Sequence, residues 1–300
     1  MTTKSTGPRQ HHYVTAGYLA GFTDTGTREG MLSVLDTKTG RWWEVKPDKA
    51  AKERDFNAVN IPGHDTNVIE SGLSDLEGKA VLLIQELSAT PRMPTSSELE
   101  VLANFMALQA VRVPAHRTPV ARFIEEVGKD LLRLSAQTPE QFELMNQRLR
   151  AAGQDIPDSS FEDWRQYVER EDVVKANQTW LVQSMLELMG TVLTALEHRH
   201  WHLHVVRPGA PDLVCSDNPV RVTRLRGRPG SPGGFMEPHT IVTMPLTKRL
   251  MVTATFDGPG QVTEAGETQV AKFNIATVTG AQRQVYAPAR EMYGFRKSQS

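Results

Sequence analysis

Apolar residues near the start of this 300-residue chain recur at the spacing of an α-helix. Val14, Tyr18 and Phe22 are four residues apart, so they would share one buried stripe on a helix that runs from His11 to Phe22. Both His11 and His12 would then lie at the N-terminal end of a packed helix. Because neutral histidine is both a base and a metal ligand, this helix end is the first place where the sequence indicates a functional site.

The pattern then changes to that of a β-hairpin, and a long helical region follows. Two apolar runs within 31–45 flank a loop at 36–40 that has glycine near its end. Ser97 opens a predicted capping box, and Thr138 and Gly153 are the predicted cap and stop of a later helix. The periodicity predicts helices over 67–87, 102–113, 120–134, 139–152 and 173–195, with a weaker amphipathic piece at 161–171 and interruptions at Pro114 and Pro119.

From His200 onward, short β-rich runs separated by Gly and Pro replace the helices. We therefore expect an α+β fold, with a helical middle region, an N-terminal hairpin and a C-terminal mostly antiparallel sheet. We expect a single domain over 1–300, with flexible ends at 1–10 and 296–300, a mainly helical sub-region at 11–197 and a β-rich one at 198–295. The predicted strands are 201–206, 213–216, 220–223, 241–246, 250–255 and 284–287, with a loop at 226–234 and a last helix at 267–281.

Composition and charge restrict the class of protein more than its chemistry. Apolar residues make up 39% of the chain, which is enough for a substantial core, and the net charge of -1 gives no global attraction to nucleic acid or to an anionic membrane. A single cysteine rules out an intrachain disulfide, and neither a signal-peptide core nor an apolar run of about 18 residues is present. We expect a soluble cytoplasmic protein that does not associate with membranes.

Several short motifs, in order along nearly the whole chain, resemble those of an uncharacterised bacterial family, domain of unknown function 4238. The family usually has proline after the valine of its opening motif, where this chain has Thr15. The resemblance brings no established activity, so it supports the presence of a site by implication only. The motifs are 11–14 with Tyr18, Leu19 and Phe22, 32–36 with Gly40, 53–56, Glu70 with Glu77, Gln109 with Arg112, 216–220, and 274–286.

Polar pairs in the helical region are candidates for chemistry. Glu70 and Glu77 are two helical turns apart and share a face, where they could line a cleft or form a solvated acidic stripe. Gln109 and Arg112 are three residues apart and could bind one ligand together, since the guanidinium suits a carboxylate or a phosphate. Arg112 could instead cap the carbonyl groups at the end of its helix.

A second candidate lies where a short apolar strand runs into the turn 216–219. Asp217 is a candidate general base or metal ligand there, and Asn218 is a candidate substrate-binding group. The same residues also suit a purely structural turn. Cys215 has no nucleophile motif around it and is predicted to be a buried strand residue. Histidines at 198, 200, 202 and 204 would line one face of a strand, but a helix end is the favoured interpretation of their first part.

These groups support two hypotheses. In the first, the protein is a metal-dependent hydrolase, a nuclease or phosphoesterase that uses Mg²⁺ or Mn²⁺. Its catalytic groups would be His12, Asp217 and Glu77, its substrate-binding groups Gln109, Arg112 and Asn218, and its metal ligands His11, His12, Glu70 and Asp217. Nucleic acid would be a partner through Arg221, Arg224, Arg226 and Arg228, although a solvated strand and loop is the favoured interpretation of these arginines. In the second, the protein is a non-enzymatic ligand- or protein-binding module whose polar motifs are structural.

Overall fold

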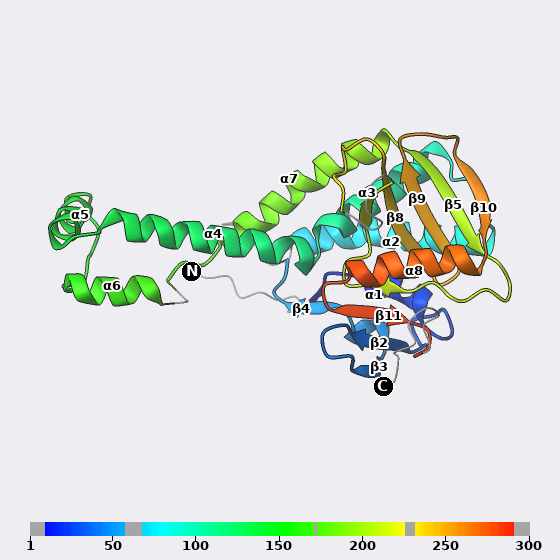
Figure 1. The fold of residues 1–300 in the computed structure, drawn as a ribbon, viewed down its shortest axis with the longest axis horizontal. Helices are drawn as coiled ribbons and strands as arrows, with labels where there is room; N and C mark the ends of the chain where they lie inside the picture. The colour runs from blue at the N-terminus through cyan, green and yellow to red at the C-terminus, as the bar shows by residue number, and fades with distance from the viewer. Residues whose placement is uncertain (1–9, 58–67, 171–172, 226–231, 291–300) are drawn as a thin grey trace. The chain divides into compact units, whose positions relative to one another are not determined.

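The computed structural model describes residues 10–57, 68–170, 173–225 and 232–290 (Figure 1). The chain forms two compact units, of which unit 1 takes residues 1–116 and 182–300 and unit 2 takes residues 117–181. The predicted α+β class is confirmed. Unit 2 lies within the predicted helical sub-region, so the division into units does not follow the sub-region boundary at 197. The predicted flexible ends lie outside the described residues except for Gln10, which belongs to a strand.

Unit 1 contains two main sheets and a small two-stranded sheet. The larger main sheet has the order β10-β5-β9-β8-β7, and its neighbours are antiparallel except for the parallel pair β10 and β5. The mostly antiparallel sheet is therefore confirmed, but the apolar pattern does not predict β10, because most of its residues are exposed. The larger sheet comprises β5 (His200–Val206), β7 (Arg221–Arg224), β8 (Thr240–Thr247), β9 (Leu250–Thr255) and β10 (Gln261–Ala265).

The predicted hairpin is confirmed, and it shares its sheet with the end of the chain. Leu35 is paired with Trp42 across the hairpin, and Val285 is paired with Leu35 on the other side. The smaller main sheet has the order β3-β2-β11-β6, so strands from both ends of the sequence form one layer. It comprises β2 (Leu32–Asp36), β3 (Trp42–Val45), β6 (Cys215–Ser216) and β11 (Gln284–Ala287).

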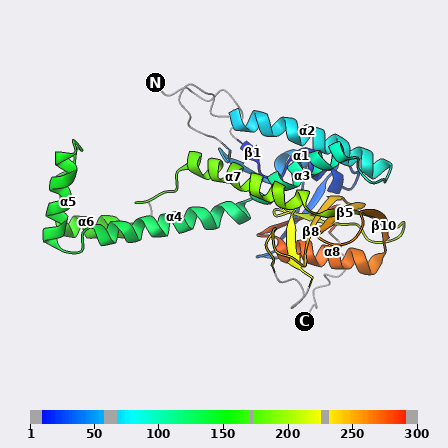
Figure 2. The same ribbon diagram turned by 90° about the horizontal axis from the view of Figure 1, so that it is seen from above.

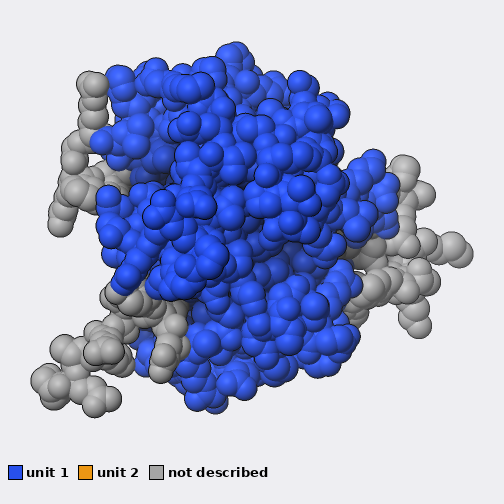
Figure 3. Space-filling model, turned by 90° about the vertical axis from the view of Figure 1, so that its right-hand side faces the viewer, with its two compact units in different colours: residues 1–116, 182–300 blue, residues 117–181 orange. Residues whose placement is uncertain are grey.

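Helices cover both faces of the larger sheet. Figures 1 and 2 show α8 on one side of it and α2 and α3 on the other, and Figure 3 shows unit 1 as one packed body. Alternation along β9 explains this arrangement, since Leu250 and Val252 join the main core whereas Met251 joins the smaller core under α8. The helices of unit 1 are α1 (Ala16–Leu19), α2 (Val68–Ala89), α3 (Ser96–Val111), most of α7 (Gln178–Glu197), and α8 (Glu267–Gly280), with 3-10 turns η1 (Ala20–Phe22) and η2 (Pro47–Lys49).

The prediction of a helix that begins at His11 is wrong. Residues 10–12 form strand β1 (Gln10–His12), which pairs antiparallel with β4 (Lys52–Arg54). Thr15 has extended backbone angles and precedes α1, so the helical part starts at Ala16. The apolar spacing of Val14, Tyr18 and Phe22 still marks the core, because all three side chains are buried. Strand pairing determines the conformation of residues 10–12, and periodicity within one segment cannot detect a partner so distant in sequence.

Three helix boundaries differ from the sequence prediction. Helix α3 is capped by Thr95, which exchanges hydrogen bonds with Glu98, so the predicted box at Ser97 is displaced by two residues. Helix α4 begins at Pro114 and continues through Pro119, where only one backbone donor is lost near the helix start. Helix α7 begins at Gln178 rather than at 173, because the Asn177 side chain accepts a hydrogen bond from the Trp180 N–H group.

Unit 2 is helical. Thr138 caps α5 as predicted, and Gly153 has the positive φ that ends a helix. Arg133 donates two hydrogen bonds to Glu169 and so joins α4 to α6. Phe142 contacts Trp164, which fastens α5 to α6. The helices are α4 (Pro114–Ser135), which starts in unit 1, α5 (Pro139–Ala151) and α6 (Phe161–Glu169).

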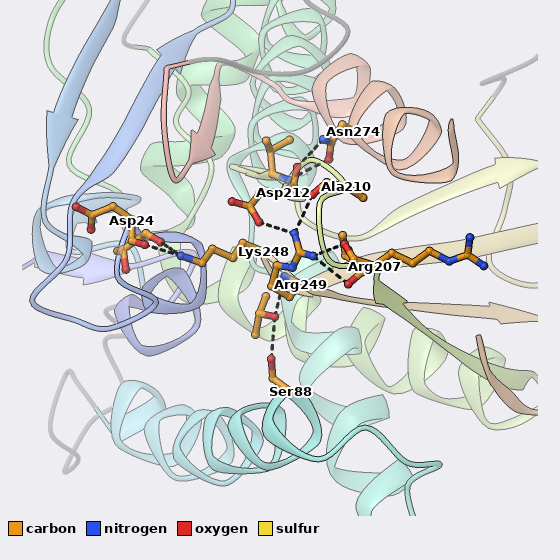
Figure 4. Close-up of polar contacts among 12 residues, drawn as sticks. Asp24, Ser88, Arg207, Ala210, Asp212, Lys248, Arg249 and Asn274 are labelled. Atoms are coloured by element: carbon orange, nitrogen blue, oxygen red, sulfur yellow. Dashed lines mark hydrogen bonds and ion pairs between the residues drawn. The ribbon is translucent and has the colours of Figure 1, made fainter. Parts of the chain in front are cut away.

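The turn between β8 and β9 anchors the N-terminal segment in unit 1 (Figure 4). Lys248 donates hydrogen bonds to the backbone carbonyl groups of Thr23 and Asp24, with N···O distances of 2.9 and 2.6 Å. Thr247 bonds to Ser88 of α2 at 3.2 Å. One turn of the sheet thereby fixes both α2 and the segment that follows α1, and these elements carry the candidate site.

Among the described helices, α7 is long and apolar enough to cross a membrane by length and composition alone. One such helix is weak evidence for a membrane span, because a core helix of a globular protein passes the same test.

Candidate functional site

A hollow of about 520 Å³ in unit 1 brings together residues that are far apart in the sequence. Here it is called the acid–base hollow, and β1, α1 and α2 all contribute to its wall. His12 and Glu77, both predicted to be catalytic, line it together. Its polar lining consists of His12, Thr15, Arg28, Asp48, Ser74, Glu77 and Gln85.

The two adjacent histidines have different surroundings because they are on a strand. Side chains alternate along β1, so His11 is only 1% exposed whereas His12 reaches the acid–base hollow. The His11 Nδ1 atom accepts a hydrogen bond of 2.9 Å from the Asn57 N–H group. This nitrogen is therefore committed to the backbone, which does not suit the predicted role of His11 as a metal ligand through Nδ1. His12 is the histidine that faces the hollow.

Glu77 forms an ion pair with Arg112 of α3. The Arg112 side chain is completely buried, and the Glu77 side chain is 12% exposed. A buried guanidinium requires a counter-charge, since burying an ion without a partner costs on the order of several kcal/mol of folding free energy. Arg112 therefore positions the Glu77 side chain at the wall of the acid–base hollow. The predicted cap role of Arg112 at the helix end is replaced by this contact between α2 and α3.

Gln109 adds a second buried polar group one turn before Arg112. Both side-chain polar atoms of Gln109, and the Nε and Nη1 atoms of Arg112, have no hydrogen-bond partner within the described part of the chain. Phe105 is on the same face of α3, and its ring centroid lies 5.6 Å from that of Tyr18 in an edge-to-face arrangement, so this face is directed toward α1. Such unsatisfied groups are costly, and ordered water or a ligand is the usual explanation for them.

Asp217 has contacts of a different kind. Its carboxylate accepts hydrogen bonds of 2.8 Å from three consecutive backbone N–H groups, those of Gln282, Arg283 and Gln284. Burial raises its pKa above the ordinary value, and the three N–H donors oppose that rise. Asp217 is not among the residues that line the acid–base hollow, so the described contacts do not bring it together with His12. It ties the turn after β6 to the start of β11.

Asn218 and Cys215 also contribute to the packing around this turn. Asn218 donates a hydrogen bond of 3.1 Å to the Gly280 carbonyl group at the end of α8, and its Oδ1 atom has no partner among the described residues. Cys215 is fully buried as predicted, and its sulfur lies 3.5 Å from the Tyr18 hydroxyl oxygen. Burial raises the pKa of the Cys215 thiol to about 12, so it remains protonated at neutral pH.

The histidine series does not form a metal site in the described residues. His198 follows α7 and is exposed, and β5 begins at His200. His204 is held between two hydroxyl groups, those of Thr253 at 3.0 Å and Thr263 at 2.9 Å. No three His, Cys, Asp or Glu side chains in the described ranges lie together as a metal site requires. The Glu70 side chain, a predicted ligand, lies outside the described part of the structure.

The basic residues proposed for nucleic acid are only partly described. Arg224 forms an ion pair with Glu237 at 2.6 Å, and Arg221 is partly buried, with its Nε atom lacking a partner among the described residues. Arg226 and Arg228 lie outside the described residues. Of the arginines seen, one is already neutralised by an acid.

Sequence reasoning missed several residues of the acid–base hollow. Ser74 and Gln85 lie at steps of three and eight residues from Glu77 on α2, so helical spacing could have identified them. Arg28 and Asp48 lie in irregular segments or a short turn, where no periodic signal is available. Arg199 was also missed, and its guanidinium donates to the Thr240 and Ala254 carbonyl groups at 3.0 and 3.1 Å.

Comparison with known proteins identifies one family. The family model described as a protein of unknown function (DUF4238) matches residues 10–291. No curated protein and no solved structure gives a significant match. The matched range contains every element described above, including β1, α2 and α3 with the acid–base hollow. The chain therefore belongs to the DUF4238 family.

Proposed function

We propose that the protein is a hydrolase that acts on small substrates with an anionic group, most suitably phosphoesters, in the acid–base hollow. One observation carries the proposal: His12 and Glu77 line the same hollow, and Glu77 is paired with the buried Arg112. The volume of about 520 Å³ is within the range of small-molecule sites. A cytoplasmic location belongs to the same proposal and is supported by the single, buried cysteine.

The chemistry assigns different roles to the two groups. His12 takes a proton from water as the water oxygen attacks the phosphorus atom of the ester. The bond between phosphorus and the ester oxygen breaks, and the same proton is returned from His12 to the departing alkoxide. Glu77, paired with Arg112, orients the water or stabilises the imidazolium. One water molecule is consumed, and the products are an alcohol and a phosphate.

The buried polar groups of α3 support recognition of an anion. Arg112 uses one nitrogen for Glu77, and its Nε and Nη1 atoms have no partner among the described residues. The amide nitrogen and the amide oxygen of Gln109 also have no partner among the described residues. Arg28, at the wall of the acid–base hollow, adds an exposed positive charge. In this proposal Arg28 holds the phosphate group at the wall of the acid–base hollow, and Arg112, which does not line the hollow, acts through its ion pair with Glu77.

The binding-module alternative is favoured by a specific set of contacts. His11, Asp217 and Asn218 all bond to the protein's own backbone, as groups that lock a fold would. The hydrolytic proposal therefore does not use these residues. It also includes no step through Mg²⁺ or Mn²⁺, since the described residues do not supply a set of ligands.

The direct experiment measures release of p-nitrophenol from p-nitrophenyl phosphate and from bis(p-nitrophenyl) phosphate. Each assay is run with Mg²⁺, with Mn²⁺ and after chelation. We expect turnover of at least one ester, and a loss of about 100-fold or more in His12→Gln, which is the scale of general base catalysis. Glu77→Gln should lose activity to a similar order, with its folding checked by circular dichroism.

Matched controls distinguish the site from general effects of substitution. His200→Gln and Glu100→Gln change exposed residues of the same types outside the acid–base hollow, and both should retain the wild-type rate. The proposal fails if neither ester is hydrolysed under any condition, or if His12→Gln is as active as the wild type. Binding of inorganic phosphate without turnover would select the binding module instead.

A further inference from the structure

Unit 2 contains a second hollow, of about 1110 Å³, whose lining comes from α4, α5 and α6 and the adjoining loops. Here it is called the aromatic hollow. It lies entirely within residues 117–181 and shares no lining residue with the acid–base hollow. Its size is slightly above the range of about 300–1,000 Å³ that is usual for sites that bind a drug-sized ligand. The hydrolytic proposal makes no use of it.

One face of α5 supplies a wall of the aromatic hollow and carries a single polar group. Phe142, Met145, Asn146 and Leu149 are spaced as neighbours on one helical face, and all four line the hollow. Asn146 is only 4% exposed. No hydrogen bond of its side chain is found within the described ranges of the chain, and its amide atoms are not among the fully shielded ones there, so they have access to solvent. A buried amide in an apolar stripe costs stability unless water or a ligand satisfies it.

Aromatic rings from α5 and α6 also line the hollow. The ring centroids of Phe142 and Trp164 are 5.9 Å apart with an interplanar angle of 34°, and those of Trp164 and Tyr167 are 6.1 Å apart at 32°. The Trp164 ring is therefore flanked by two tilted rings, and the three rings together form an aromatic surface at the hollow. Planar aromatic molecules gain most from such a surface, because offset stacking adds to the burial of apolar area.

Charged groups at the aromatic hollow are exposed and already engaged. The Asp163 carboxylate accepts hydrogen bonds from the Ser160 N–H and hydroxyl groups at the start of α6. The Arg170 guanidinium lies 5.8 Å from the centre of the Tyr167 ring. One charge of each sign is present at the edge, and the buried polar group is the neutral Asn146. An uncharged ligand fits this environment better than an ion.

We propose that the aromatic hollow is a binding site for an uncharged planar aromatic molecule that carries one hydrogen-bonding group. The rings of the ligand stack against Trp164 and its neighbours, and its polar group bonds to the amide of Asn146. The inference is independent of the acid–base hollow, because the two sites share neither residues nor unit.

The test uses N-phenyl-1-naphthylamine, a fluorescent neutral aromatic amine with one N–H group, and 1-benzylnaphthalene, in which CH₂ replaces N–H. The full-length protein should bind the amine with an increase in its fluorescence. The dissociation constant of the hydrocarbon, measured by displacement of the amine, should be about three- to tenfold higher than that of the amine. This difference corresponds to one net hydrogen bond. In Asn146→Leu this preference should disappear, while the hydrocarbon still binds.

The control is Leu144→Ala, since Leu144 is on α5 but 46% exposed and does not line the aromatic hollow. It should keep the wild-type preference for the amine. Circular dichroism of Asn146→Leu verifies that its helices are intact. The proposal is overturned if the amine does not bind, or if wild type and Asn146→Leu show the same preference. It is also overturned if sedimentation shows self-association that the amine reverses, because a second copy of the chain would then be the occupant.

Discussion

Two acidic side chains of unit 1, Glu77 and Asp217, are both largely shielded from water but are held in different ways. Asp217 accepts hydrogen bonds from three backbone N–H groups, one at Oδ1 and two at Oδ2. Glu77 is held by the side chain of Arg112 and lies at the wall of a hollow. A carboxylate committed to backbone donors joins segments of the fold, whereas one held by a side chain at a hollow is still able to meet a ligand. The sequence presents both simply as acids near apolar residues.

The largest expected effect is that of Asp217→Ala on stability. The substitution leaves three backbone N–H groups without their acceptor, so we expect a loss of roughly 3–5 kcal/mol in the free energy of unfolding. Urea denaturation, followed by circular dichroism, measures this loss. Asp217→Asn keeps one oxygen acceptor and should lose less.

The same experiment can break the comparison between the two acids. Groups kept for chemistry often cost stability. If Asp217 were a general base, the Asp217→Ala protein would therefore be as stable as the wild type or more stable. A midpoint for Asp217→Ala at or above that of the wild type would therefore return Asp217 to the catalytic candidates.

The next effect concerns the ion pair of Glu77 with Arg112. Glu77→Leu leaves a fully buried guanidinium without its counter-charge, so we expect a loss of about 3 kcal/mol in the free energy of unfolding. The double variant Glu77→Leu with Arg112→Met removes both charges and should recover most of that loss while remaining inactive. A double variant no more stable than Glu77→Leu would show that the pairing does not account for the effect of the single substitution.

The fold was predictable wherever one segment contains its own signal. The hairpin at 31–45, the helix capped by Thr138 and the strand at 250–255 each follow from local spacing and turn residues. Strand β1 was not predictable in this way, since pairing with β4 determines its conformation. Strand β10 is mostly exposed and lacks the apolar alternation on which strand prediction depends.

The candidate site was predictable as a set of residue types but not as an arrangement. His12, Glu77 and Arg112 were all named from the sequence, and the structure places the first two in one hollow and the third against Glu77. Nothing in the sequence distinguishes Glu77 from Asp217, because the donors of Asp217 are backbone groups of a segment more than sixty residues later. Backbone donors have no sequence signature, so tertiary structure is needed to identify them.

A smaller effect applies the same comparison to histidines. His204 is held between Thr253 and Thr263, whereas His12 faces a hollow. Burial, with a smaller contribution from His202, lowers the pKa of His204 from 6.5 to about 4. Above pH 6.5 the imidazole is neutral whether the chain is folded or not, and stability is at its full value. As pH falls from 6.5 toward 4, the unfolded chain takes up a proton that the folded one does not, so stability decreases.

Thermal melts between pH 4 and 7 test this expectation for His204. The variant His204→Gln keeps a hydrogen-bonding side chain and removes the titration, so its melting temperature should depend less on pH over this range. An equally steep dependence in His204→Gln would show that other groups, His202 among them, are responsible for it.

The smallest effect concerns Asp36, which is held in both ways at once. Its carboxylate accepts hydrogen bonds from the Lys38 and Thr39 N–H groups and from the Arg283 guanidinium, which is 60% exposed. These donors, the guanidinium first, lower the pKa of Asp36 from 3.8 to about 2. The stabilisation is therefore present above pH 3.8 and is lost as pH falls toward 2, where the folded chain also takes up the proton.

Acid titration of the folded fraction should show a shallower dependence on pH over this range in Asp36→Asn than in the wild type. Arg283→Gln removes only the solvated partner and keeps both backbone donors, so it should have a smaller effect than Asp36→Asn. An equal effect of the two variants would mean that the guanidinium, and not the backbone, holds this carboxylate, and would place Asp36 with Glu77 rather than with Asp217.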